Sequence, residues 1–249
     1  MREGATDALE AIISSTDSYR SVRGRMMAAI RSSGAGRVVD LCSGGGGPWL
    51  SESWSSECGH AASGQGGSLR VALTDKFPSE ALATRVRQRR GICSVVDSPV
   101  DATSVPEELC GFRTIFSSFH HFPDSFAGKI LGDAVRRGDG FASAEITSRS
   151  GRAMATICLL PFFVWWLTPR MRPFRWSRLL LTYVIPAIPF VILWDGLVSC
   201  LRTRTPDELL ALARPFPQYE WTAGYAGGRG VWLPPVYLIG LPRGLNNRR

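Results

Sequence analysis

Lysine is scarce in this chain of 249 residues. Only Lys76 and Lys129 occur, so arginine supplies almost all of the positive charge behind the formal net charge of +8. A basic balance favours an anionic partner such as a phospholipid headgroup, but an arginine-rich proteome produces the same balance without a functional cause. Apolar residues make up 45% and charged residues 20%, which excludes a chain disordered along its whole length.

Paired cysteines are also missing. The six cysteines are scattered, with no C-x-x-C pair and no pair of histidines at zinc-site spacing. This pattern argues against a zinc site and a disulfide framework, so no bound metal is expected. The start of the sequence has no apolar run of the kind found in a signal peptide, and a cytoplasmic location is therefore expected.

Short apolar segments alternate with helical patterns through most of the chain. Residues 1–34 are expected to form an N-terminal helical segment that ends at Gly34. Strands are expected at 37–41, 69–75, 91–97, 112–119 and 140–147, with helices at 79–89, 123–140 and 205–213 and two further strands within 218–242. The Ser/Gly-rich stretch 49–67 is expected to be a loop. The alternation predicts one α/β domain over residues 1–249, doubly wound around a mostly parallel sheet.

A glycine cluster follows the first predicted strand. Residues 38–47 read VVDLCSGGGG, a buried strand that carries Asp40 and then a run of glycines. Glycines let the backbone pass close under a nucleotide-like ligand, and an acid at the strand end can accept hydrogen bonds. A dinucleotide fingerprint that starts at Gly44 would need glycine or alanine at position 49, where Trp49 stands. The cluster indicates a nucleotide-like ligand; a merely flexible loop is the alternative.

The cluster resembles motif I of the class I S-adenosylmethionine (SAM)-dependent methyltransferases, an acid followed by glycines at every second position. Asp40, Gly44 and Gly46 match that motif, and Cys42 replaces its first glycine. The resemblance covers residues 20–147 and resumes over residues 205–242. It implies SAM as the cofactor and a seven-stranded Rossmann-like sheet with a C-terminal antiparallel strand hairpin.

Acids at later strand ends fit the same resemblance. In this family an acid after the second strand binds the ribose hydroxyls of SAM, and an acid after the third strand faces the adenine amino group. Asp75 and Asp101 occupy these positions, and FHHF at 119–122 matches the end of the fourth strand. The resemblance assigns cofactor binding to Asp40, Cys42, Gly44, Gly46, Asp75, Lys76, Asp101, Ala102 and Ser117. The separation between the first two acids is longer than usual because of inserted Ser/Gly-rich sequence at 55–68.

Three residues near the expected strand ends are candidates for proton transfer. His120 and His121 follow the fourth strand, and histidine exchanges a proton near neutral pH. Glu145 lies near the end of the fifth strand and is a candidate binder or base. Each has a structural alternative: the histidines as supports of the loop around SAM, and Glu145 as a solvated or capping group.

An apolar insertion at residues 152–204 separates the fifth strand from the last helix. Two uncharged stretches, 153–169 and 179–194, flank a segment that contains Arg170, Arg172, Arg175 and Arg178. Prolines interrupt both stretches, and each is shorter than the about 20 residues of a membrane-spanning helix, so two clean spans are not expected. The insertion is interpreted as a hydrophobic lid, a re-entrant or interfacial membrane hairpin, or both; a plain enlargement of the core is the alternative. Asp195 lies at the end of the second stretch and would need a partner if buried.

The predicted function is therefore SAM-dependent methylation of a small, apolar molecule, with peripheral contact to the inner face of a membrane. Nucleic acid is not expected as a partner, because the insertion is too apolar for such a surface. Two alternatives stay open. One is a catalytically idle SAM-fold protein that acts as a membrane-associated interaction module, which Cys42 favours. The other is a nicotinamide-dependent oxidoreductase, which Asp40 and Trp49 disfavour.

Overall fold

The computed structural model describes residues 17–61, 69–89, 91–170, 174, 176–227 and 231–244, and the chain divides into two compact units. The larger unit comprises residues 19–146 and 204–249. The smaller unit comprises residues 147–203 together with the start of the chain. Residues 147–203 overlap the predicted insertion at residues 152–204.

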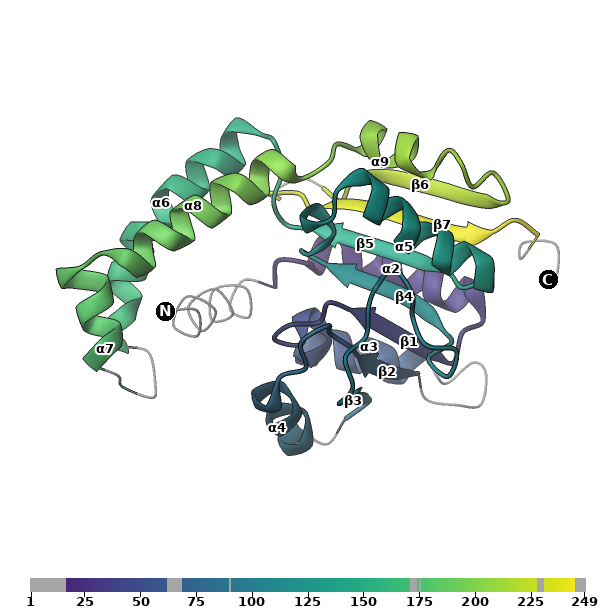
Figure 1. The fold of residues 1–249 in the computed structure, drawn as a ribbon, viewed down its shortest axis with the longest axis horizontal. Coiled ribbons are helices and arrows are strands. Elements are labelled where there is room, and N and C mark those ends of the chain that lie inside the picture. The colour runs from purple at the N-terminus through teal and green to yellow at the C-terminus, as the bar shows by residue number, and fades with distance from the viewer. Residues whose placement is uncertain are drawn as a thin grey trace. The chain divides into compact units, whose positions relative to one another are not determined.

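The larger unit is built on a seven-stranded sheet with the strand order β3-β2-β1-β4-β5-β7-β6 (Figure 1). Its strands are β1 (Arg37–Leu41), β2 (Arg70–Leu73), β3 (Cys93–Val95), β4 (Phe112–Phe116), β5 (Phe141–Glu145), β6 (Tyr219–Tyr225) and β7 (Val236–Pro242). The first five strands are parallel, and β7 runs antiparallel to both β5 and β6. This topology confirms the doubly wound α/β fold with a C-terminal antiparallel hairpin.

Helices cover both faces of this sheet. They are α2 (Arg20–Ser33), α3 (Glu52–Ala61), α4 (Glu80–Arg89), α5 (Asp124–Arg137) and α9 (Pro206–Ala213). In Figure 1, α5 and α9 lie on the near face and α2 and α3 on the far face. Near-face packing brings Leu41, Ile130 and Phe141 into one apolar cluster. Met26 of α2 and Trp54 of α3 are fully buried as well. Apolar side chains on both faces of the strands explain why the sheet is covered on both sides.

Three helix ends follow from local sequence; those of α2 and α9 match the prediction, whereas α5 ends at Gly138, two residues before the predicted end at residue 140. Helices α2 and α5 end at Gly34 and Gly138, whose φ angles of 70° and 72° lie in the left-handed region that glycine favours. Helix α9 begins with a capping box, in which Thr205 and Glu208 each accept the other's backbone N–H through their side chains.

The stretch after the glycine cluster is helical, so the loop expected at 49–67 is wrong for its described part. A 3₁₀ turn, η1 (Gly47–Leu50), leads into α3, and residues 62–67 lie outside the described residues. Trp54 and Cys58 are four residues apart, share one helix face and are fully buried. The rings of Trp49 and Trp54 meet edge to face at 5.0 Å. Tertiary packing of this face outweighs the weak helix preference of the serine-rich sequence.

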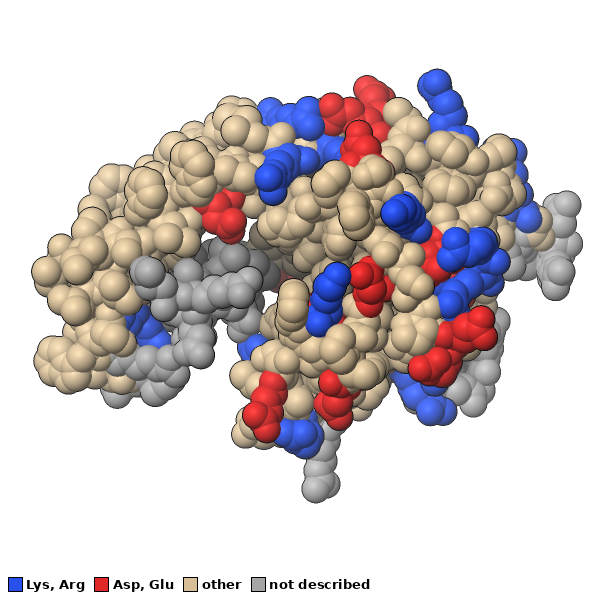
Figure 2. Space-filling model, in the orientation of Figure 1, with Lys and Arg blue, Asp and Glu red and all other residues tan. Residues whose placement is uncertain are grey.

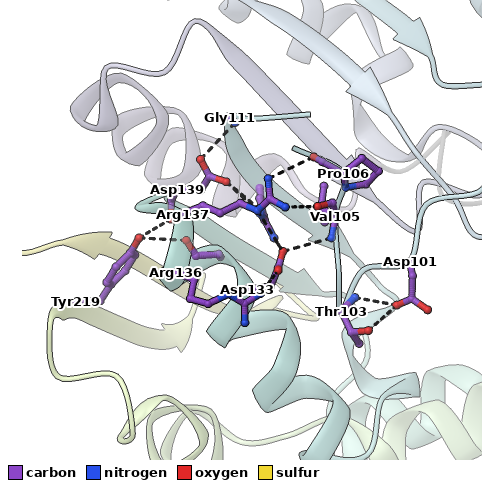
Figure 3. Close-up of polar contacts among 12 residues, drawn as sticks. Asp101, Thr103, Val105, Pro106, Gly111, Asp133, Arg136, Arg137, Asp139 and Tyr219 are labelled. Atoms are coloured by element: carbon purple, nitrogen blue, oxygen red, sulfur yellow. Dashed lines mark hydrogen bonds and ion pairs between the residues drawn. The ribbon is translucent and has the colours of Figure 1, made fainter. Parts of the chain in front are cut away.

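A buried polar cluster ties β4 to α5, near the N-terminal end of the strand (Figure 3). Arg113 of β4 is fully buried and forms ion pairs with Asp133 of α5 and with Asp139. Arg137 also donates to backbone carbonyls of the segment before β4. The hydroxyl of Tyr219 donates to the carbonyl of Asp139 at 2.9 Å. The two carboxylates compensate the buried guanidinium, so the cluster fastens strand to helix rather than presenting charge to a ligand.

The smaller unit is a helical hairpin. Its elements are α6 (Gly151–Leu167), η4 (Thr168–Arg170), α7 (Trp176–Leu179), the π-helical turn η5 (Leu180–Val184) and α8 (Ala187–Arg202). Helices α6 and α8 run antiparallel, with Ile157 packed on Gly196. At the base of the hairpin, the hydroxyl oxygens of Thr147 and Thr203 lie 2.7 Å apart.

The proline in α6 does not break the helix, contrary to the expectation from the sequence. The helix continues through Pro161, because Leu160 and Val164 on either side of it pack against α8. Residues Gly151–Arg170 are long and apolar enough, by length and composition, to cross a membrane. The segments Trp176–Val184 and Ala187–Arg202 form a second apolar pair that is bent by 71°.

Candidate functional site

The glycine cluster forms a tight loop at the C-terminal end of β1. The N–H of Gly46 donates to the carbonyl of Ser43 at 2.7 Å. A Cβ at Gly46 would lie 2.4 Å from Leu50 Cδ1, and its φ is 100°, so only glycine fits there. A Cβ at Gly44 would meet no atom of the chain within 4 Å. The backbone at Gly44 is therefore accessible to a ligand.

Cys42 adopts the backbone conformation of the glycine that it replaces. Its φ of 58° lies in the left-handed region, which costs free energy for a residue with a Cβ. The side chain packs against the near-face core cluster, and burial raises the pKa of the Cys42 thiol to about 12. The thiol is therefore protonated near neutral pH and is not poised for chemistry.

Asp40 supports this loop from inside the protein. Its carboxylate is 1% exposed and accepts hydrogen bonds from Ser43 Oγ at 2.7 Å and Thr114 Oγ1 at 2.6 Å. Thr114 can reach it because the two residues are register partners on neighbouring strands. Burial raises the pKa of Asp40 to about 6 although both hydrogen bonds oppose that rise. Asp40 thus shapes the loop, and any contribution to binding comes through the loop rather than from an exposed carboxylate.

Asp75 joins the loop after β1 to the loop after β2. One carboxylate oxygen accepts the N–H of Gly44 at 3.0 Å, and the other accepts the N–H of Phe77 at 2.9 Å. The residue is only half-buried. Because an ionised carboxylate has about four lone-pair sites, Asp75 retains capacity for ligand hydroxyls.

Lys76 and Asp101 form an exposed ion pair at 3.0 Å between the loops after β2 and β3. Hydrogen bonds from the hydroxyl and the backbone N–H of Thr103 lower the pKa of Asp101 to about 2, and Lys76 adds to this effect. The carboxylate is therefore ionised at neutral pH. The neighbouring Ala102 has its side chain in the core, so only its backbone is available for binding.

Ser117 directly follows β4 and has a φ of 44°, a second strained non-glycine position at the same edge of the sheet. Its Oγ accepts a hydrogen bond of 2.6 Å from the hydroxyl of Tyr19. Tyr19 is buried, and burial raises its pKa. No motif in the sequence marks Tyr19, which precedes α2, so this support of the strand end was not predicted.

His120 and Glu145 form a buried pair. The Nδ1 atom of His120 lies 2.6 Å from Glu145 Oε2, and the other oxygen of Glu145 accepts the backbone N–H groups of Phe119 and His120 at 2.8 and 3.2 Å. Glu145 is only 4% exposed, so its solvated alternative is wrong. His121 is exposed instead, with its ring centroid 4.1 Å from that of His120. Of the two histidines, His120 is the one that Glu145 orients.

Arg204 is a second residue that the sequence did not single out. Its guanidinium pairs with Asp124 at 2.8 Å and donates to backbone carbonyls of the turn that contains His120. A lone arginine before a helix cap carries no sequence signal of such a role. Within the part of the chain that the structure describes, no group of three or more His, Cys, Asp or Glu residues could hold a metal ion.

No protein-family model matches the chain, and no curated protein sequence matches it. Among solved structures, the chain is similar to the methyltransferase domain of bacterial CtHen1-C, with 12% identity, a TM-score of 0.52 and coverage of 90% of this chain and 98% of that one. It is also similar to the plantazolicin methyltransferase BpumL in complex with a pentazolic desmethylPZN analog and SAH, with 10% identity, a TM-score of 0.52 and coverage of 97% and 98%. The chain therefore has the fold of the class I SAM-dependent methyltransferases.

Proposed function

We propose that the chain is a SAM-dependent methyltransferase that acts on a small, apolar acceptor. The observation that carries the proposal is the link between Asp75 and Gly44, which places an ionisable carboxylate beside an open glycine backbone at the strand ends. Ligands of open α/β sheets bind at the carboxyl ends of the strands. Because one fold hosts many functions, the proposal depends on this geometry and not on the fold alone.

The residues present fit SAM. Asp75 retains lone pairs for the ribose hydroxyls, and Gly44 lets the ligand approach the backbone. Asp101 lies in the loop after β3, and its side chain is exposed. As the resemblance implies, it would face the adenine amino group. BpumL, which shares the fold, is seen with SAH, and this supports the same cofactor here.

His120 is proposed as the base that removes the acceptor's proton. Bound SAM would supply a methyl group activated by a positively charged sulfur, and attack of the acceptor atom on the methyl carbon would release the neutral thioether S-adenosylhomocysteine. The Glu145 carboxylate holds the Nδ1 side of the ring, so Nε2 is the nitrogen that takes the proton as the acceptor–methyl bond forms and the carbon–sulfur bond breaks. A positioned base of this kind contributes about 10²–10⁴-fold to the rate. Glu145 acts through His120 and is a positioning residue.

The class of acceptor and the location form the second part of the proposal. The smaller unit exposes large apolar side chains, which suits a chain that handles an apolar acceptor at the surface of a membrane. The cytoplasmic location and the inner face of the membrane remain proposals from the sequence. Contact with the inner face of the membrane would bring the enzyme to a place where apolar molecules collect.

The decisive test is isothermal titration of the purified chain with SAM and, separately, with NADH. We expect SAM to bind and NADH not to bind. Asp75→Ala should weaken SAM binding by about 1.5–3 kcal/mol, the scale for a hydrogen-bond partner that carries a charge. Glu107→Ala, which removes an exposed acid before β4, should leave the affinity unchanged. NADH binding without SAM binding would overturn the proposal, and an unaltered affinity in Asp75→Ala would remove Asp75 as the ribose ligand.

A further inference from the structure

The outward faces of both hairpin helices are apolar. Three exposed side chains, each 57–63% accessible, follow one face of α6: Leu159, Phe162 and Trp166. Three more, each 59–64% accessible, follow one face of α8: Phe190, Trp194 and Leu201. The spacings of three, four and seven residues place each set on one side of its helix. Figure 2 shows this unit with few charged side chains on the visible face. A surface helix in water normally directs such a face inward.

These outward side chains are not needed to hold the hairpin together. Its interior is a small separate core of Val164, Ile188 and Ile192. A Cβ at Gly196 would lie 2.7 Å from Ile157, so the glycine allows the two helices to pack closely. Small residues at such contacts are typical of helix pairs in an apolar solvent. The inward faces are thus satisfied by each other, and the outward faces remain for another partner.

The hairpin also carries most of the chain's net positive charge. Residues 147–203 contain seven arginines and one aspartate, a net charge of +6 within a chain whose net charge is +8. The guanidinium of the exposed Arg170 lies over the ring of Trp166 at 4.4 Å. Tryptophan and arginine side by side are typical of the headgroup layer of a membrane, and anionic lipids attract such basic segments.

Two charged positions indicate how the hairpin meets the lipid. Asp195 is exposed about halfway along α8, contrary to the buried position considered from the sequence. A hairpin that crossed the bilayer would place this carboxylate near the middle of a hydrocarbon layer about 30 Å thick. A hairpin that lay along the surface would keep Asp195 and Arg170 at headgroup depth while Phe162 and Trp194 enter the apolar layer.

We propose that the hairpin of residues 147–203 docks along the headgroup layer of a membrane that contains anionic lipid. The named surface consists of the outward side chains Leu159, Phe162, Trp166, Phe190, Trp194 and Leu201. A second copy of the chain is a poorer occupant, because two hairpins with a charge of +6 repel each other. Docking goes beyond the proposed methyl transfer and does not depend on it.

The test compares flotation with vesicles of phosphatidylcholine and with vesicles of phosphatidylcholine and phosphatidylglycerol. The wild type should float with the anionic vesicles, and raised salt should weaken this binding because exposed charges are screened over about 10 Å at moderate ionic strength. The double variant Trp166→Ser/Trp194→Ser should bind at least tenfold more weakly. Trp232→Ser, which removes an equally exposed tryptophan from the larger unit, should bind as the wild type does. Brominated lipid should quench tryptophan fluorescence in the wild type more than in the double variant.

Folding and self-association are checked in parallel. Circular dichroism and SAM titration of each variant show whether the larger unit is intact, so loss of SAM binding is distinguished from loss of lipid binding. The proposal is overturned if the wild type ignores both kinds of vesicle or if the double variant floats as well as the wild type. It is also overturned if light scattering shows that the wild type is a dimer without lipid and that the double variant is a monomer. Tight binding to neutral vesicles, unchanged by salt, would refute the role of anionic lipid.

Discussion

The Nη2 atom of Arg204 lies 2.6 Å from the backbone carbonyl oxygen of Phe122. The same guanidinium donates to the carbonyl of Phe119 at 3.3 Å. These carbonyls flank His120, and Glu145 holds the same turn through two backbone N–H groups. Glu145 precedes the hairpin by one intervening residue, and Arg204 follows it directly. The two chain segments that lead into the hairpin are therefore the ones that fix the His120 turn.

Arg204→Gln should lower the free energy of unfolding by about 1–3 kcal/mol, because two partly buried backbone carbonyls lose a charged donor. Urea unfolding followed by circular dichroism measures this change. The control is Arg214→Gln, which alters an exposed arginine at the end of α9 and should change stability by less than about 0.5 kcal/mol. Equal stabilities of the two variants would show that Arg204 does not hold the turn.

Glu145→Gln should change the tautomer of His120. An ionised Glu145 accepts only from a protonated Nδ1, whereas a glutamine amide can either donate or accept, so the preference for the Nδ1–H tautomer should be lost. The chain has three histidines, so ¹⁵N spectra of the imidazole nitrogens resolve the effect, and His121→Ala assigns the neighbouring signal. An unchanged His120 signal would show that Glu145 does not set the tautomer. Glu145→Gln and His121→Ala should both bind SAM with the same affinity as the wild type.

Cys42 should accept glycine but not valine. Glycine adopts a φ of 58° without strain, and this gain roughly offsets its larger entropy loss on folding, so Cys42→Gly should change stability by less than about 1 kcal/mol. A β-branched residue is a severe outlier at such an angle, and Cys42→Val should cost more than about 2 kcal/mol. Thermal unfolding of both variants gives the comparison. Similar stabilities for valine and glycine would contradict the left-handed conformation.

Asp40 should make the protein without bound cofactor more stable at mildly acidic pH. Burial raises its pKa from 3.8 to about 6, so the folded state binds a proton more tightly than the unfolded state does. This contribution is complete below the unfolded pKa and is lost as the pH rises through about 6. The free energy of unfolding should therefore increase by about 1 kcal/mol between pH 7 and pH 5 relative to that of Asp40→Asn. Urea titrations of both proteins at the two pH values test this, and parallel pH profiles would contradict it.

Most of the sheet could be predicted from the sequence because its signals are local. Buried apolar runs marked the strands, and Gly34 and Thr205 marked helix ends. Helix α3 could not be predicted, because its stability comes from the burial of Trp54 and Cys58 in the assembled core.

The candidate site also has a part that the sequence predicts and a part that depends on the folded chain. The positions of Asp75 and Asp101 at strand ends follow from the order of the motifs. The support of Asp40 by Thr114 depends on the register of two strands 74 residues apart in sequence. The contacts of Tyr19 and Arg204 with distant turns likewise exist only in the folded chain. Sequence patterns report the intrinsic preferences of neighbouring residues, and these contacts join residues that are far apart in the chain.

The hydroxyl oxygens of Thr147 and Thr203 lie 2.7 Å apart, so the two ends of the hairpin are close together in space. A module attached at a single point can be gained, lost or exchanged between proteins without moving either β5 or α9, because a short linker closes the gap at little entropic cost. The same geometry makes the module portable. Residues 147–203 could be transferred into a surface turn of an unrelated soluble protein, where their affinity for lipid would be measured without any methyltransferase attached.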